Sequence, residues 1–104
     1  MPEWSTKVYY VYIMASRPRG VLYDGITSRL ATRAWQHREH ILEGSAKRYL
    51  VDHLVYCERH LDAAEAARRE RAMKRWRRDW KIELIEKDNP TWRDLFPDVV
   101  CADG

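Results

Sequence analysis

The sequence predicts a single small domain of the α/β class, of the α+β type, built from a few strands and several helices. Two runs rich in aromatic and β-branched residues flank the turn-forming segment Ser16–Gly20, a pattern typical of a β-hairpin. Elsewhere, apolar residues recur at helical spacing. The expected elements are strands at about 8–15, 21–26 and 53–58, helices at about 29–42, 61–76 and 77–87, and a last helical turn at 91–95.

The composition is that of one globular domain. The chain has 104 residues, 45% hydrophobic and 34% charged, so we expect one domain over 1–104 with its core at about 7–95. No apolar run approaches the ~20 residues of a membrane-spanning helix, and the N-terminus lacks a signal-peptide pattern. The two cysteines, Cys57 and Cys101, do not make a disulfide framework. We therefore expect a cytoplasmic protein with reduced thiols and no membrane association.

The first expected strand carries tyrosines on one face. Tyr10 and Tyr12 are two residues apart and share a face of the strand, whereas Val11 and Ile13 point to the other face. Tyr23 lies at the far end of the return strand, just before Asp24-Gly25. The hairpin can thus present phenols on one face and pack aliphatic side chains into a core on the other. The alternative is that these tyrosines only pack against the sheet and have no chemical role.

Ser28 is expected to cap the helix at 29–42, because its hydroxyl can accept a bond from a free backbone N–H. Arg33 and His37 are four residues apart and share one helix face. A guanidinium can hold a phosphate through two hydrogen bonds, and an imidazole can add a donor or relay a proton. Simple surface solvation is the alternative for both. The positions expected to face the core are Leu30, Ala34 and Ile41.

Glu70 is the most informative single residue. It falls within an apolar stripe of the helix at 61–76, and a carboxylate on a packed face is costly unless it is paired or binds a cation. Two roles for Glu70 are open. It can form an ion pair with a nearby arginine, or it can bind Mg²⁺, which often uses only one or two protein carboxylates. The stripe consists of Ala63, Ala66, Ala67, Met73 and Trp76.

The helix at 77–87 is expected to bury Trp80, Leu84 and one of Ile82 and Ile85, and Asn89-Pro90 is expected to end it. Positive charge is concentrated in the helical segment at residues 65–81, which holds eight Lys or Arg against three Asp or Glu. Such a helix suggests a surface that faces nucleic acid, with a solvated basic face as the alternative. Trp35 and Trp76 are candidates for stacking on bases, although most of the tryptophans should fill the core.

Taken together, these residues resemble the GIY-YIG nuclease domain, and are closest to its small, single-domain bacterial members. Tyr10-Val11-Tyr12 falls at the first motif and Tyr23-Asp24-Gly25 at the second. Arg33 and His37 lie ten and fourteen residues after Tyr23, as the arginine and histidine of the family do, and Glu70 falls at the family's metal-binding glutamate. The similarity continues to the Asn-Pro-Thr-Trp-Arg-Asp-Leu segment at 89–95 and so covers nearly the whole chain.

The resemblance implies a three-stranded antiparallel sheet flanked by helices, and phosphodiester hydrolysis with one divalent metal. Glu70 would hold Mg²⁺ or Mn²⁺, Tyr12 would prepare the water with help from Tyr23 or His37, and Arg33 would stabilise charge on the phosphoryl oxygens. The basic segment would follow the nucleic-acid backbone without reading its sequence. The residues expected to contact nucleic acid are Lys47, Arg48, Arg69, Lys74 and Arg77.

Two positions depart from the family pattern. Tyr10 replaces a glycine of the first motif, which leaves Tyr12 in place. Asp24 stands where an aliphatic residue is usual. It is harmless if it points away from the phenols; if it points toward them, it adds negative charge and could help to hold the metal. Lys47 lies where some homing enzymes have a histidine, so phosphate binding would replace a proton-relay role there.

The hypothesis from the sequence is a metal-dependent DNA endonuclease, structure-selective or weakly sequence-specific, with a role in DNA repair or recombination. RNA is not excluded as a substrate, and a protein partner could recruit so small an enzyme. The alternative is a catalytically inactive nucleic-acid-binding module on the same fold, motivated by Asp24 and the basic helix. An adaptor that uses exposed tryptophans and the acidic tail has no specific support.

Overall fold

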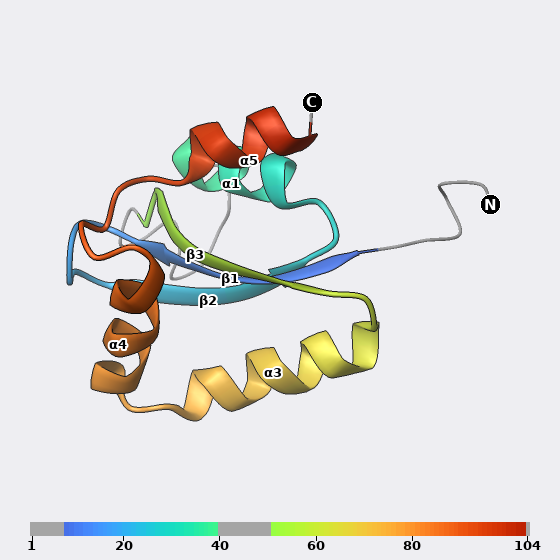
Figure 1. Ribbon diagram of the computed structural model, residues 1–104, viewed down its shortest axis with the longest axis horizontal. Helices are drawn as coiled ribbons and strands as arrows, with labels where there is room; N and C mark the ends of the chain where they lie inside the picture. Colours follow the sequence, from blue (N-terminus) through green and yellow to red (C-terminus); the bar gives the residue numbers. More distant parts are fainter. Residues whose placement is uncertain (1–7, 40–50, 104) are drawn as a thin grey trace.

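A three-stranded antiparallel sheet forms the centre of the molecule, with strand order β2–β1–β3 (Figure 1). The computed structural model describes residues 8–39 and 51–103. The strands are β1 (Tyr9–Ala15), β2 (Leu22–Thr27) and β3 (His53–His60), and the helices are α1 (Leu30–Arg38), α3 (Ala63–Arg75), α4 (Arg78–Asp88) and α5 (Phe96–Asp103). This confirms the predicted α+β class and the three-stranded antiparallel sheet.

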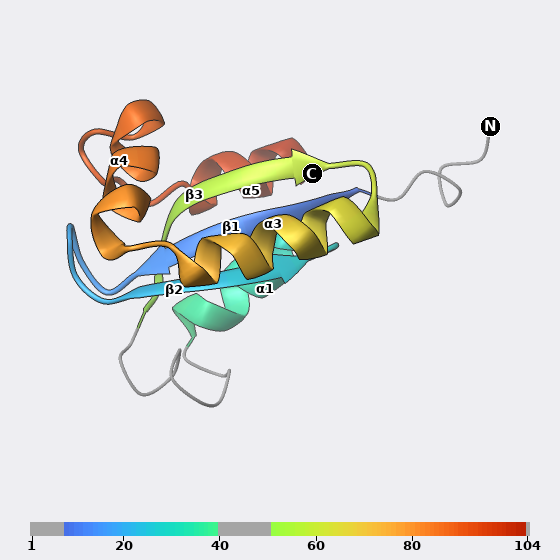
Figure 2. The same cartoon turned by 90° about the horizontal axis from the view of Figure 1, so that it is seen from below.

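Helices cover both faces of the sheet. α1 and α5 lie together on one face, and α3 runs along the other with α4 beyond its C-terminal end (Figures 1 and 2). β1 is the central strand, and its residues from Val11 to Ala15 are fully buried. Because side chains alternate along a strand, Tyr12 and Met14 enter the core beside α1, whereas Val11 and Ile13 enter the core beside α3 and α4. The predicted split of tyrosines and aliphatic residues is confirmed.

The hairpin turn has its own hydrogen bonds. The backbone N–H of Val21 donates to Oγ of Ser16 at 2.9 Å, and the N–H of Gly20 donates to the carbonyl of Arg17 at 2.8 Å. Glycine is required at position 20, because an added Cβ would lie 2.4 Å from Ser16 Oγ. The turn also holds α4: Arg78 donates to the carbonyl of Gly20 at 2.6 Å, and Arg19 makes two 2.9 Å bonds to Glu86.

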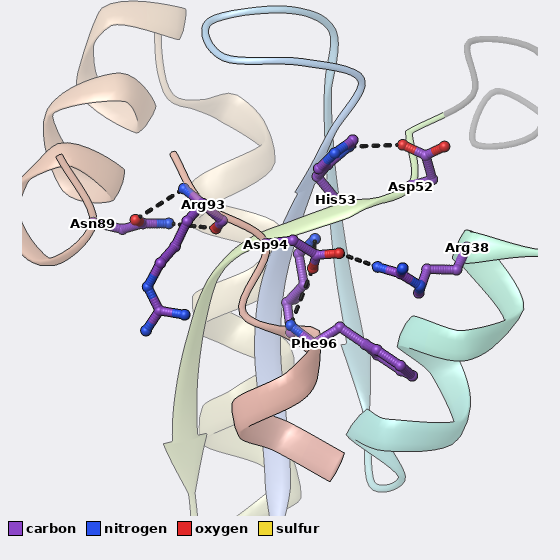
Figure 3. Close-up of polar contacts among 8 residues, drawn as sticks. Arg38, Asp52, His53, Asn89, Arg93, Asp94 and Phe96 are labelled. Carbon is purple, nitrogen blue, oxygen red and sulfur yellow. Dashed lines mark hydrogen bonds and ion pairs between the residues drawn. The ribbon is translucent and has the colours of Figure 1, made fainter. Parts of the chain in front are cut away.

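Two polar side chains fasten the segment after α4 to the sheet (Figure 3). Asn89 donates to the carbonyls of Val55 and Arg93 at 3.1 and 2.9 Å, and its side-chain oxygen accepts the N–H of Arg93. Asp94 accepts the N–H groups of Leu54 and Phe96 at 3.1 and 3.0 Å and pairs with Arg38 of α1. The chain is thereby held against β3 until α5 begins.

Three local predictions are wrong. The residues at 91–95 form no helical turn, because Asn89 and Asp94 bind the backbone there; the helix starts at Phe96 instead. Ser28 does not cap α1: Arg29 is the N-cap residue, without a side-chain bond, and Thr27 Oγ1 accepts the N–H of Arg29. Trp80 is 46% exposed rather than buried, and Ile85 is the fully buried residue of α4.

Other element boundaries shift by a few residues. β2 begins and ends one residue later than expected, and β3 continues to His60. α3 begins at Ala63, where Asp62 is the N-cap residue and accepts the N–H of Ala64. α4 ends at Asp88 before Asn89-Pro90, as predicted. Leu30 and Ala34 are buried as expected, whereas Ile41 lies outside the described residues.

Candidate active site

Tyr12 lies against Gly25 in the middle of the β1–β2 pair. The two residues are direct partners in the antiparallel register, and the Tyr12 side chain is 1% exposed. A Cβ added at Gly25 would lie 2.4 Å from both Cζ and the hydroxyl oxygen of Tyr12. No other amino acid leaves room for the ring in this position, so the glycine of the second motif has a steric cause.

The Tyr12 hydroxyl reaches His37 of α1. Its oxygen lies 3.2 Å from Nε2 of His37, and the two rings meet edge to face with centroids 5.7 Å apart. The ring of Tyr23, from β2, is tilted against the same imidazole at 5.2 Å. His37 is buried, and its Nδ1 has no hydrogen-bond partner among the described residues. One tyrosine from each strand of the hairpin therefore contacts the imidazole of His37.

Burial raises the pKa of the Tyr12 phenol well above its ordinary value, and the neighbouring Tyr23 and Glu70 act in the same direction. Arg33 opposes them through its positive charge and its hydrogen bonding to the phenol. Arg33 and His37 come from α1, Tyr23 from β2 and Glu70 from α3. The structure thus brings all five residues singled out in the sequence into one electrostatic neighbourhood.

His37 is electrically neutral near pH 7. Burial lowers the pKa of the imidazole from 6.5 to about 4, and the positive charge of Arg33 adds to this effect. A neutral imidazole has one nitrogen free to accept a proton, and Nε2 is the nitrogen that faces the phenol. Tyr12 and His37 are therefore within hydrogen-bonding distance of each other, with the imidazole neutral.

Glu70 lies on the buried face of α3, as its place in the apolar stripe predicts, although Ala63 of that stripe is exposed. Its ion-pair partner is a lysine rather than an arginine: Oε2 of Glu70 lies 2.7 Å from Nζ of Lys74, one turn further along the helix. No group of three or more His, Cys, Asp and Glu side chains forms a metal cage among residues 8–39 and 51–103. A single carboxylate fits Mg²⁺, which keeps several waters and shares substrate phosphates.

Asp24 points away from the phenols. It pairs with Ile13 in the sheet, on the face covered by α3 and α4, and its Oδ2 lies 2.7 Å from Nζ of Lys81. Burial raises the pKa of this carboxyl, and Lys81 counteracts the rise. Of the two orientations left open by the sequence, the structure has the one that keeps its charge off the phenol face. Nothing in the sequence pointed to Lys81 as the partner, because it lies on α4, remote along the chain.

The residues predicted to contact nucleic acid have mixed placements. Lys47 and Arg48 lie outside the described residues. Arg69 donates to Glu58 at 2.9 Å, Lys74 pairs with Glu70, and Arg77 lies 3.5 Å from Asp79. Within the described part of the chain, three exposed arginines of α3 have no acidic partner, and the sequence analysis did not single them out: Arg68, Arg71 and Arg75.

Comparison with known proteins identifies one family. The model of the GIY-YIG catalytic domain matches residues 8–83, which is most of the chain and includes Tyr12, Tyr23, Arg33, His37 and Glu70. No curated protein and no solved structure shows a significant match. Among the described residues, no helix is long and apolar enough to cross a membrane.

Proposed function

This chain belongs to the GIY-YIG nuclease family, and we propose that it is an endonuclease that needs a divalent cation, Mg²⁺ or Mn²⁺, to hydrolyse phosphodiester bonds in DNA. Family membership makes it a nuclease with a nucleic-acid substrate. The contacts among Tyr12, Tyr23 and His37 support the catalytic proposal, and so do the charges of Arg33 and Glu70, both of which act on the Tyr12 phenol. Together these groups can activate a water, stabilise charge on phosphoryl oxygens and hold a cation, which are the tasks of phosphodiester hydrolysis.

Glu70 would hold the cation. Its carboxylate is the acidic group of the site, and Lys74 Nζ lies 2.7 Å from Oε2, so the ammonium group would compete with a metal for that oxygen. A bound divalent cation supplies Lewis-acid stabilisation of the charge on phosphoryl and leaving oxygens. GIY-YIG nucleases generally use divalent metal ions, and the single carboxylate suits Mg²⁺ or Mn²⁺ with most of their waters retained.

Tyr12 and His37 form the proposed proton path. Because burial raises the pKa of Tyr12, a free phenolate is scarce at neutral pH. His37 is neutral and its Nε2 can accept the phenolic proton at 3.2 Å. The phenol oxygen can then take a proton from the attacking water as its own proton passes to the imidazole. Tyr23, packed against the same ring, fixes the orientation of His37.

Arg33 is the candidate for binding the scissile phosphate. It sits one turn before His37 on α1, is only partly buried, and acts electrostatically on both Tyr12 and His37. A guanidinium can donate two hydrogen bonds to phosphoryl oxygens and stabilise the charge that grows on them during hydrolysis. Its partial exposure leaves it reachable for substrate, whereas Tyr12 and His37 are covered.

The alternative, an inactive nucleic-acid-binding module, depended mainly on Asp24. Because Asp24 pairs with Lys81 on the opposite face of the sheet, it does not disturb the phenols, and the catalytic proposal is favoured. The exposed arginines of α3, Arg68, Arg71 and Arg75, can contact a phosphate backbone, and such contacts carry no sequence information. We therefore propose a structure-selective or weakly sequence-specific enzyme with a role in DNA repair or recombination.

A cleavage panel tests the function. Purified protein is incubated with single-stranded, duplex, nicked and branched DNA, with Mg²⁺, with Mn²⁺ and with EDTA. The proposal expects endonucleolytic products from at least one form, in the presence of a divalent cation only. Intact DNA in every reaction, together with salt-dependent DNA binding that survives EDTA, would instead support the inactive binding module.

A further inference from the structure

A groove with aromatic walls lies where α3 passes into α4. Figures 1 and 2 show how the two helices meet there. It has a volume of about 360 Å³. Trp80 is 46% exposed in it, which is unusual for so large an apolar side chain, while Ile85 occupies the core side of the same helix. The groove is lined by Trp76, Trp80, Glu83, Leu84 and Lys87.

The two tryptophans are held in place. Their rings meet edge to face, with centroids 6.1 Å apart and planes at 77°. The guanidinium of Arg69 lies 4.9 Å from the Trp76 centroid, and that of Arg77 lies 5.1 Å from the Trp80 centroid. Arg69 is itself fixed by its bonds to Glu58 of β3. The aromatic surface is thus preorganised, with a guanidinium group against each ring.

We propose that this groove binds an unpaired base of the nucleic-acid substrate, stacked on Trp80. The inference rests on the proposed function, because a nucleic-acid substrate supplies both the polyanion and the flat aromatic ligand that the groove suits. Aromatic side chains set in a basic surface are the recurring way to bind single-stranded segments without reading their sequence. The alternative occupant, an apolar segment of a protein, would gain nothing from the guanidinium groups over the rings.

Glu83 favours a base over a phosphate in the groove. A carboxylate repels phosphate, but it can accept a hydrogen bond from the exocyclic amino group of cytosine or adenine. Lys87, one turn beyond Glu83 on α4, leaves a cation at the rim for the flanking phosphate. The groove therefore offers an apolar floor for the base, an acceptor for its edge and a positive charge for the backbone.

The exposed face of α3 can deliver the strand to this groove. Arg68, Arg71 and Arg75 recur at helical spacing on the side opposite the buried Glu70, and none has an acidic partner among the described residues. Trp76 follows directly after Arg75. A strand that follows these arginines would therefore reach the groove at the C-terminal end of α3.

A cycle of paired changes in protein and DNA tests the inference. All proteins carry Glu70→Gln so that the DNA stays intact. Each is titrated, by fluorescence anisotropy at fixed salt, with a hairpin duplex that bears a short single-stranded overhang, and with the same hairpin whose overhang is abasic. We expect the parent to bind the intact overhang about 5- to 150-fold more tightly than the abasic one. Trp80→Ala should bind both equally, and Trp80→Phe should restore part of the difference.

Trp35→Ala is the comparison variant, because among the described tryptophans Trp35 is the other highly exposed one, at 48%, and it lies on α1. It should keep the discrimination against the abasic hairpin. The groove proposal would be overturned if Trp80→Ala preferred the intact overhang as strongly as the parent does. It would also be overturned if Trp35→Ala, rather than Trp80→Ala, lost this preference. Trp80→Ala with Glu70 intact distinguishes the groove proposal from the nuclease proposal. If this enzyme still cleaves other DNA forms with a divalent cation, the proposed function stands even where the anisotropy titrations overturn the groove.

Discussion

The ring of Tyr12 occupies the space that a side chain at position 25 would fill, so Tyr12 and Gly25 are a steric pair across the β1–β2 ladder. This contact sets the position of the phenol, and the phenol in turn meets His37 at 3.2 Å. The absence of a side chain at Gly25 in β2 thus determines the position of the phenol in the candidate active site.

Gly25→Ala tests the steric pair. The new methyl group would lie 2.4 Å from the Tyr12 hydroxyl, so the ring must move off His37. We expect a loss of stability of about 1–3 kcal/mol and a loss of cleavage larger than the change in folded fraction explains. Urea denaturation and cleavage rates measure the two effects. Val21→Ala, at an exposed position directly before β2, is the control; unchanged cleavage by Gly25→Ala would contradict the account.

The buried neutral His37 should make stability depend on pH. Its pKa falls from 6.5 to about 4 on folding, so between these values the unfolded chain binds more protons than the folded one. The contribution of neutral His37 is therefore fully present above pH 6.5 and is lost as the pH falls toward 4, at most about 3 kcal/mol in all. Urea denaturation at pH 7 and pH 4.5 should show a smaller drop for His37→Gln than for the wild type. Equal drops would mean that His37 titrates normally.

Lys74 should compete with a divalent cation for Glu70. Its ammonium group lies 2.7 Å from the carboxylate, and it must leave before a metal occupies that place. Lys74→Met should bind Mn²⁺ several-fold more tightly in isothermal titration calorimetry, since removing one charge near a surface changes affinity by roughly 1 kcal/mol. Arg71→Met removes an equal charge from the exposed face of the same helix and should leave Mn²⁺ affinity unchanged. Tighter binding in both variants would indicate a general charge effect instead.

The ion pair of Asp24 and Lys81 should be structural. Lys81→Met leaves a buried carboxylate without its partner, and removing one member of a buried pair typically costs about 3–5 kcal/mol. Replacing both residues, Asp24→Leu with Lys81→Met, should recover most of that stability and retain metal-dependent cleavage. A double variant that is stable but inactive would show that Asp24 takes part in catalysis.

Local sequence patterns were sufficient for the hairpin, the burial of Glu70 and the sharing of a face by Arg33 and His37, because alternation along a strand and helical spacing determine them. They were insufficient where a distant group decides the outcome. Asp24 is oriented by Lys81, and Trp80 is exposed because Ile85 fills the core side of α4. The start of α5 depends on Asp94 binding the backbone of β3. Such tertiary contacts leave no periodic signal in the sequence.

Cleavage by Glu70→Ala is the most direct test of the central claim, that the gathered side chains form a metal-dependent nuclease site. The variant is compared with wild type on the DNA form that the wild type cuts best, across a range of Mg²⁺ concentrations, with circular dichroism to verify the fold. The account predicts that Glu70→Ala remains folded and DNA-bound but yields no product at any Mg²⁺ concentration. Mg²⁺-dependent cleavage at the wild-type rate by a folded Glu70→Ala protein would contradict it.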